Sequence, residues 1–462
     1  MTHQFAPFLL RTAAIAVTLA GAHPTLADEP LTPDAAAAFA LAHNPVIRAA
    51  DRGVDGAQAD RRLARAGWLP HLDLSEDYAR STNPVFVFAS KLGQGRFGPQ
   101  DFALDSLNSP DPFTNATTRV GLQQSLWDGG RTFAAGRAAK LGVTAAGEEL
   151  AHTRDEVAFG AKRAFWDAVL ADELVSASRD AEKAAVANAE LAGRLVDEGI
   201  GVPSDRMQAD VRLGEVSAMR VGAEQNVLIA RAALRRALGA KGTETFTLAA
   251  PAIDADDKGT AAEGPGTSLT EALAARPDLL AFDARIGQAH EGETIALSGR
   301  LPQFGVGAQY EWNGSEPFRS SGTNWSVAAF LRIPLYDGCE GLARHQRARA
   351  DRLRLEAMRE ALADTVDVEL QEADARRRTA EARLRSAESN VSLSQEALRI
   401  VRERYGEGLA MIVELLGAEA SATGARAARA QASRDLAVSR LAVELAAGRP
   451  LAARQPANTA KE

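Results

Sequence analysis

The chain has 462 residues, of which 25% are charged, and its formal net charge at pH 7 is −8. An acidic chain whose Lys and Arg residues do not gather with aromatic residues lacks the features of a nucleic-acid-binding surface. The single cysteine, Cys339, excludes an internal disulfide, so packing must hold the fold together.

The first residues predict export. Arg11 precedes an apolar run at 12–21, and Thr25-Leu26-Ala27 supplies small residues at a cleavage site. The run is too short for a retained anchor helix, so we expect residues 1–27 to be a signal peptide. Asp28 follows the site, so no lipid-modified cysteine is expected there. No later apolar run has the length of a membrane helix, and any membrane contact must therefore use amphipathic strands.

The first half of the mature chain predicts helices around a pair of strands. Thr32 can cap a helix over 31–66, and Pro45 interrupts it. Apolar and polar residues then alternate in two stretches, which is typical of strands with two different faces. The proline-free stretch that follows corresponds to a helix of roughly 100 Å, which needs partner helices along its length. We predict a first structural repeat at 28–240, with strands at 71–80 and 117–127 and long helices at 130–198 and 203–239.

The segment between these two strands, 81–116, is predicted to be a loop because Gly and Pro recur in it. Two interpretations stay open. The segment is either a surface or lid loop, or a loop folded on its own apolar residues. Its phenylalanines are Phe86, Phe88, Phe97, Phe102 and Phe113.

The second half repeats this plan. After a linker rich in Gly, Pro, Asp and Thr at 241–266, a helix interrupted near Pro277 leads to two more alternating stretches. We predict a second structural repeat at 267–448, with strands at 303–312 and 324–336 and long helices at 338–407 and 411–448. Residues 449–462 are expected to form a flexible tail.

The two halves are related by a constant offset. The tetrapeptide that starts at Leu126 recurs as the one that starts at Leu335, 209 residues later. The same offset relates Glu198-Gly199 to Glu407-Gly408. Such an offset, held over more than 110 residues, indicates a duplicated unit.

An Asp-Gly pair stands at each passage from strand to long helix. An aspartate carboxylate can accept hydrogen bonds from the first backbone amides of a helix, which have no partner inside it. We therefore interpret Asp128-Gly129 and Asp337-Gly338 as helix caps and not as a catalytic carboxylate pair.

Four strands cannot close a barrel, and an open sheet edge in lipid would leave backbone groups unpaired at several kcal/mol each. Three chains would supply twelve strands, enough for a barrel with an open lumen. The long helices would continue that barrel as a tube.

At this point the chain resembles the TolC-type outer-membrane efflux proteins. The resemblance rests on the signal peptide, the duplication, the Leu-Trp/Tyr-Asp-Gly junctions and the Glu-Gly turns, and it covers nearly all of the mature chain. It implies a mainly α fold with a small transmembrane β part. It also implies a homotrimer, with a twelve-stranded barrel in outer-membrane lipid and a periplasmic α-helical barrel. Such a passive exit duct works with a periplasmic adaptor and an inner-membrane transporter.

The resemblance also implies roles for the two turns between long helices. Gly199, Ile200, Gly201, Gly408, Leu409 and Ala410 would be the periplasmic tips that dock an adaptor. Glu414 matches the first acidic ring of a periplasmic gate, but Gly417 stands where a second ring is expected. Asp205 matches the acid of a latch whose basic position is Ala410 here. Plain turn chemistry for the glycines and a solvated helix charge for Glu414 are the structural alternatives.

Nothing in the sequence predicts catalysis, a cofactor or a metal site. The seven histidines form no H-x₃-H pair, and Glu149 and His152 have no further ligand near them in sequence. Gly93, Gly95 and Gly98 fit G-x-G-x-x-G, but no helix context follows that would support a dinucleotide site. The other function considered is a periplasmic coiled-coil adaptor or scaffold without a barrel. The duplicated hairpin and the four two-faced strands favour the duct.

Overall fold

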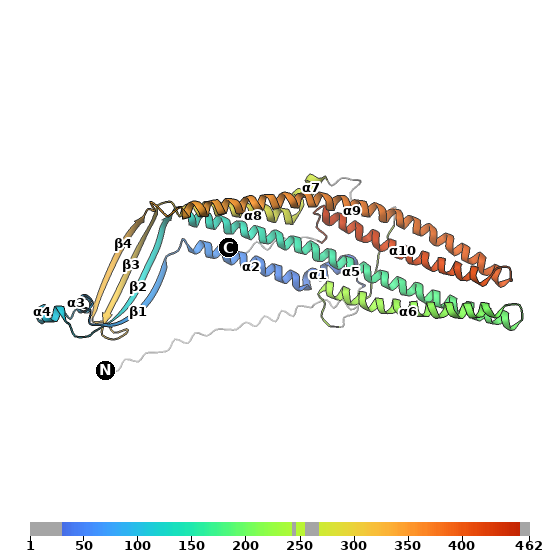
Figure 1. Ribbon diagram of the computed structural model, residues 1–462, viewed down its shortest axis with the longest axis horizontal. Helices are drawn as coiled ribbons and strands as arrows, with labels where there is room; N and C mark the ends of the chain where they lie inside the picture. Colours follow the sequence, from blue (N-terminus) through green and yellow to red (C-terminus); the bar gives the residue numbers. More distant parts are fainter. Residues whose placement is uncertain (1–29, 243–245, 255–267, 453–462) are drawn as a thin grey trace, which may run out of the picture.

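The computed structural model describes residues 30–242, 246–254 and 268–452, so the predicted signal peptide lies outside the described residues. The molecule is elongated, with a four-stranded sheet near one end and the turns between paired long helices at the other (Figure 1). Short helices extend beyond the far end of the sheet.

The first half contains two helices, a strand, three short helices, a second strand and two long helices. Their bounds are α1 Pro33–His43, α2 Pro45–Ala66, β1 His71–Ser81, α3 Pro84–Gly93, η1 Pro99–Phe102, α4 Leu104–Asn108, β2 Phe113–Asp128, α5 Arg131–Asp197 and α6 Pro203–Leu238. The Thr32 hydroxyl accepts from the Ala35 amide, as expected of the cap of α1.

The second half contains the same main elements without the short helices between its strands. Their bounds are α7 Leu269–Ala275, α8 Pro277–Ser298, β3 Gln303–Gly314, β4 Gly322–Arg332, α9 Glu340–Gly406 and α10 Ile412–Ala446. The long helices differ from the predicted ranges by at most two residues at each end, which is the usual uncertainty of a helix boundary.

The helices pack in the order of the strands. Helix α2 contacts α5, α5 contacts α8, and α8 contacts α9. The sheet has the order β1-β2-β3-β4, with every pair antiparallel, so each helix of this layer continues a strand. Helices α6 and α10 return from the tips and pack on α5 and α9, and α10 also contacts α5.

The strands differ from the prediction at their ends. The strand expected at 117–127 begins at Phe113, because Ser81 of β1 pairs with Phe113. The strand expected at 324–336 ends at Arg332, which pairs with Gln303 at the start of β3. The alternating pattern continues to Tyr336, but no residue of β3 is left to pair with it. Register shifts at a bulge between Ser125 and Trp127.

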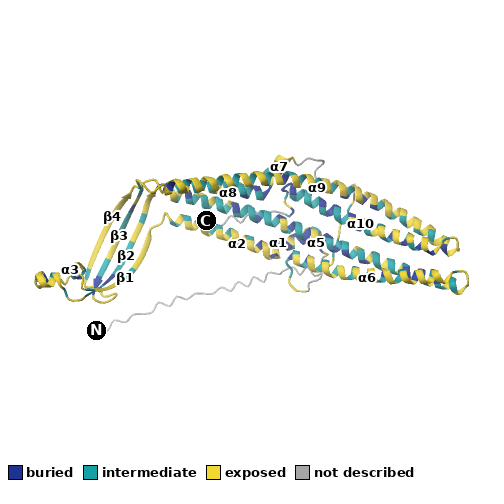
Figure 2. Ribbon diagram, viewed as in Figure 1, coloured by how far each residue is buried: buried dark blue, intermediate teal, exposed yellow. Residues whose placement is uncertain are grey.

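The main core lies where α1 meets α5 and α6, midway along the helical part (Figure 2). Phe165, Leu31 and Leu238 are fully buried in this cluster, and the Phe165 and Trp166 rings meet edge to face. Alanines separate these large side chains along α5, which lets neighbouring backbones approach closely. The core therefore joins the two helical hairpins at a single level.

Two segments expected to be loose are partly packed. Within the predicted linker, Leu248 forms a parallel bridge with Leu31, and Phe246 packs against the main core. Within the predicted tail, Leu451 is buried against Ala37 and Ala158. Apolar side chains in otherwise polar segments thus dock onto the core. The rest of the predicted tail, 453–462, is outside the described residues.

The segment 81–116 is not the irregular loop that the prediction gave. It contains α3, η1 and α4, and its last residues belong to β2. Its aromatic rings pack on one another: Phe97 lies edge to face against both Phe88 and Phe102, with ring centroids 4.7 and 5.1 Å apart. This arrangement matches the second interpretation, in which the segment folds on its own apolar residues.

None of the helices in the described ranges combines the length and the hydropathy needed to cross a membrane.

Candidate functional site

The sheet has one polar face and one apolar face. On the polar face, Arg119 Nε donates to Glu311 Oε1 at 2.7 Å, and its Nη1 lies 3.6 Å from Asp77 Oδ2. On the apolar face, Leu72 and Val327 are about 70% exposed in the single chain. No helix of the described chain covers this face. A two-faced sheet of this kind suits a wall with water on one side and lipid on the other.

Aromatic residues lie near both ends of the apolar face. Tyr310 pairs with Trp325, and the Tyr310 and Trp312 rings are 4.6 Å apart. Trp127 pairs with Phe304 at the other end. At about 3.4 Å per residue, Phe304 and Trp312 are separated by roughly 27 Å along the strand, close to the height of an apolar band between two interfacial girdles.

The outer strands of the sheet each keep one edge without a partner strand in the described chain, since β1 pairs only with β2 and β4 only with β3. An unpaired edge exposes backbone donors and acceptors, which is tolerated in water and strongly unfavourable in lipid. The apolar face therefore requires that these two edges find partners outside the single chain.

Asp128 and Asp337 both contact the first turn of a long helix. Asp128 Oδ2 accepts from the Thr132 amide at 2.9 Å, and Asp337 Oδ2 accepts from the Gly341 amide at 2.8 Å. The residues that occupy the N-cap position are Gly130 and Cys339, both with left-handed backbone. The aspartates thus make capping contacts from two residues further upstream than the sequence pattern indicated.

The turns at 198–202 and 407–411 lie together at the end of the molecule farthest from the sheet (Figure 1). Gly199 and Gly408 have φ of 78° and 73°, the left-handed conformation that favours glycine after a helix. The Ile200 amide donates to Leu195 O, and the Leu409 amide donates to Arg404 O. Both Ile200 and Leu409 are exposed, so the tips present apolar side chains outward.

A buried tyrosine joins the two tips. Tyr405 packs with Ile412 and Leu415, and Leu191 and Leu195 of α5 pack against this cluster. Burial raises the pKa of the Tyr405 hydroxyl, and the charge of Asp205 on α6 raises it further. Asp205 therefore lies near α9, across the boundary between the two hairpins. The sequence analysis missed Tyr405, although it is the only Phe, Trp or Tyr in α9.

Glu414 lies in the first turn of α10 and is exposed. Its carboxylate makes no ion pair with any residue that the structure describes, whereas Glu419 is buried and accepts from Arg402 Nη2 at 2.9 Å. Gly417, one turn after Glu414, is exposed as well. Near this tip, Glu414 is thus a carboxylate available to solvent, while Glu419 is neutralised inside the chain.

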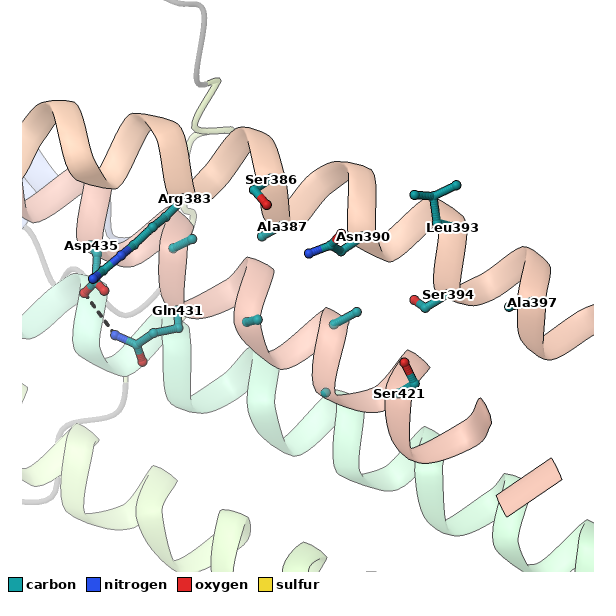
Figure 3. A pocket seen from close by; sticks show the side chains of 14 residues that line it. Arg383, Ser386, Ala387, Asn390, Leu393, Ser394, Ala397, Ser421, Gln431 and Asp435 are labelled. Atoms are coloured by element: carbon teal, nitrogen blue, oxygen red, sulfur yellow. Dashed lines mark hydrogen bonds between the residues drawn. The ribbon is translucent and has the colours of Figure 1, made fainter. Parts of the chain in front are cut away.

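A groove of about 790 Å³ runs between α9 and α10 (Figure 3). Small and polar side chains line it, and in one corner Gln431 Nε2 donates to Asp435 Oδ1 at 2.9 Å. Ser386, Asn390, Ser394, Ser421, Gly424 and Ala428 are among its lining residues. Such a lining leaves room for an approaching helix.

Glu149 and His152 are engaged in separate ion pairs, Glu149 with Arg285 and His152 with Glu156. In the described ranges, no three His, Cys, Asp or Glu side chains are grouped so that they could hold a metal ion.

Comparison with known proteins places this geometry. The sequence profile of the family described as outer membrane efflux protein matches residues 38–240 and 268–449. Protein CyaE of Bordetella pertussis is 26% identical over 416 residues, which cover 89% of this chain and 82% of that protein.

Two solved structures illustrate the shared fold. CusC, whose structures concern folding and transmembrane channel formation, has a TM-score of 0.77 at 17% identity and covers 90% of this chain and 92% of its own. The open state of the MtrE outer membrane channel of Neisseria gonorrhoeae has a TM-score of 0.73 at 20% identity and covers 91% and 89%. Because the family profile spans most of the sequence in two segments, the chain belongs to the outer membrane efflux protein family, and it is an exit duct of the outer membrane with a periplasmic helical part.

Proposed function

We propose that three copies of this chain close into one passive duct, with twelve strands in the outer membrane and a tube of long helices in the periplasm. The observation that carries the proposal is the two-faced sheet whose edge strands β1 and β4 are unpaired. Pairing β1 of one copy with β4 of the next removes every open edge and places the apolar faces outward. The polar face with Arg119 and Glu311 then lines the lumen.

The periplasmic end of this duct is proposed to be the gate. Three Glu414 carboxylates around one axis would attract cations and repel one another. The exposure of Glu414 supports this role. Asp205 is proposed to help hold the closed state through its position beside Tyr405, which stands on the other hairpin.

The tips are proposed to dock a periplasmic adaptor, which would connect the duct to an inner-membrane transporter. Turn residues Gly199, Ile200, Gly201, Gly408, Leu409 and Ala410 are the expected contacts. The exposed Ile200 and Leu409 side chains support this, because an apolar side chain at a helix tip gains from burial against a partner.

The test uses the mature protein extracted in detergent. We expect light scattering on a sizing column to give about three chains per particle. In planar bilayers we expect the E414Q variant to lose several-fold of the wild-type preference for cations, because three charges leave the narrowest part of the duct.

The double variant I200S/L409S is the matched control, because it changes the same tips and keeps Glu414. It should retain cation preference and lose binding to a periplasmic adaptor. A soluble monomer or dimer would refute the duct and favour the coiled-coil adaptor. A trimer whose selectivity is unchanged in E414Q would refute the gate alone.

A further inference from the structure

The segment between β1 and β2 is the main feature that the first half has and the second half lacks. Residues 82–112 form α3, η1 and α4, whereas β3 and β4 are joined by residues 315–321 alone. These short helices lie beyond the end of the sheet that is remote from the long helices (Figure 1). In the outer membrane this end is the outer mouth of the duct.

The segment is firmly attached to the polar side of the sheet. Gln94 is 1% exposed, and its Nε2 lies within hydrogen-bond distance of Thr114 O, Asn115 Oδ1 and Gly314 O, at 2.8–2.9 Å. The Asn115 side chain in turn donates to Asn313 Oδ1, on the same face of the sheet as Arg119 and Glu311. The attachment therefore places α3 on the lumen side of the wall.

Inside the segment, an ion pair and stacked rings set its shape. Lys91 Nζ lies 2.7 Å from Asp101 Oδ1, which links α3 to η1. The same ammonium and the Arg96 guanidinium lie 5.8 and 5.6 Å from the centre of the Phe113 ring. The segment thus has a defined structure and presents a defined surface.

That outward surface is apolar. Helix α3 turns Val87 and Ser90 inward, while Val85 and Leu92, seven residues apart on the opposite side, are 77% and 51% exposed. Phe102 and Leu104 are 67% and 75% exposed. We name Val85, Leu92, Phe102 and Leu104 the mouth surface. Contiguous apolar surface of this kind usually marks a contact with a partner.

A second observation at the same end points to a partner. Phe318, in the turn between β3 and β4, has a φ of 56° and is 74% exposed. Left-handed backbone is unfavourable for a bulky residue and persists where the surroundings hold it. The described chain does not cover this ring, so its side chain is available to another molecule.

We propose that the mouth surface contacts the mouth surfaces of two further copies of this chain above the lumen and forms an apolar constriction there. The proposal rests on the proposed trimer, because only three closed sheets create a lumen. A second copy is the favoured occupant because α3 follows β1, the strand whose free edge the next copy would pair with. Lipid is disfavoured because Gln94 attaches the segment to the polar face.

Cross-linking tests the contact directly. The variant C339G removes the only cysteine, and L104C then introduces one on the mouth surface. We expect a short bismaleimide to join chains of the detergent-extracted protein into dimers on a denaturing gel. The exposed position Leu63 on α2, changed to Cys in the same background, is the matched control and should give far less cross-linking.

Transport supplies the second readout. The variant V85S/L92S/F102S/L104S is expected to raise single-channel conductance roughly twofold or more, since polar side chains hold the three surfaces apart. The control M219S/V221S/L228S/I229S removes as many exposed apolar groups from α6 and should leave conductance unchanged.

The outcomes separate the two proposals. A three-chain particle with no cross-link at Leu104 and unchanged conductance in the mouth variant overturns the constriction and leaves the duct intact. A particle of one or two chains overturns the trimer and, with it, the constriction. Cross-linking that is equally strong at Leu63 would show a contact without position and would also count against the constriction.

Discussion

Helices α5 and α9 occupy equivalent places in the two halves and have 67 residues each, yet the chain buries them differently. In α5, 15 residues are buried, whereas α9 has seven. Helix α5 lies between α2 and α8, while α9 has α8 on one side and nothing in the described chain on the other. Duplication thus produced two similar units, one enclosed and one open, and the open side of α9 is where the α2 of another copy would lie.

The helix breaks before α2 and α8 differ in charge. Asn44 stands before Pro45 and Arg276 before Pro277, 232 residues apart. Asn44 Nδ2 donates to Ala237 O at 2.9 Å, a neutral contact. Arg276 is buried and donates to Asp278 and Glu369 at 2.7 and 2.6 Å. The second half therefore uses ions where the first half uses an amide.

The largest expected effect follows from this difference. Changing Arg276 to Leu would leave the partly buried Asp278 without its partner, at a cost of about 3–5 kcal/mol. Changing Asn44 to Ala should cost about 1–3 kcal/mol, because it removes a cap and one hydrogen bond. Thermal unfolding of the detergent-extracted variants measures both, and equal losses would contradict the distinction.

The ionic contact also adds a dependence on pH. Burial opposes ionisation of Asp278, but hydrogen bonding to Arg276 and its charge outweigh burial, so the Asp278 pKa lies below its usual range. Its contribution is complete above the unfolded pKa of about 3.9 and is lost as pH falls through the folded value. Wild type should therefore lose stability below about pH 4 more steeply than R276L.

The two strand-to-helix junctions differ in how closely they are packed. Gly129 and Gly338 both have left-handed backbone, with φ of 70° and 64°. A Cβ on Gly129 would lie 2.5 Å from Ser298 O and 2.9 Å from Leu301 Cβ, whereas nothing lies within 4 Å of one on Gly338. Ser298 and Leu301 lie between α8 and β3, so the first junction is enclosed by the second half.

The intermediate effect tests this asymmetry. We expect G129A to cost about 2–5 kcal/mol, the sum of left-handed strain and overpacking, and G338A to cost the strain alone, about 1–2 kcal/mol. The difference in unfolding temperature between the two variants is the measurement. An equally large loss in G338A would mean that the second junction is as tightly enclosed as the first in the assembled protein.

The smallest effect concerns the next position. Gly130 and Cys339 precede α5 and α9 with φ of 85° and 69°, so the second half holds a side chain where glycine is favoured. Replacing Cys339 with Gly should raise stability by up to about 1 kcal/mol, because left-handed strain is relieved. C339A, which removes the thiol but keeps a Cβ, is the control and should gain nothing. A gain of the same size in C339A would assign the effect to the thiol.

Much of this architecture could be predicted from local patterns. Proline-free stretches marked α5 and α9 to within two residues, and period-two alternation marked all four strands. The predicted caps at Asp128 and Asp337 followed from residue type alone, and hydrogen bonds to Thr132 and Gly341 are present. These features depend on neighbours a few residues apart, which a sequence displays directly.

The failures have one physical cause, since each depends on a partner distant in sequence. Arg332 ends β4 because β3 starts at Gln303, and the alternation up to Tyr336 cannot reveal that limit. The Gly- and Pro-containing segment after β1 folds into helices because Gln94 finds acceptors on β2 and β3. Tyr405 gained its place between the hairpins only when α5 and α6 came beside it.

The sequence by itself therefore determined the repeated plan of helices and strands, the turn glycines and the two-faced wall, because these depend on propensity and periodicity. The tertiary structure alone decided which repeat is enclosed, where the segment after β1 is attached, and which carboxylates are neutralised. Those properties depend on burial and on ion pairs between residues far apart in the chain, as in the pairing of Arg276 with Glu369.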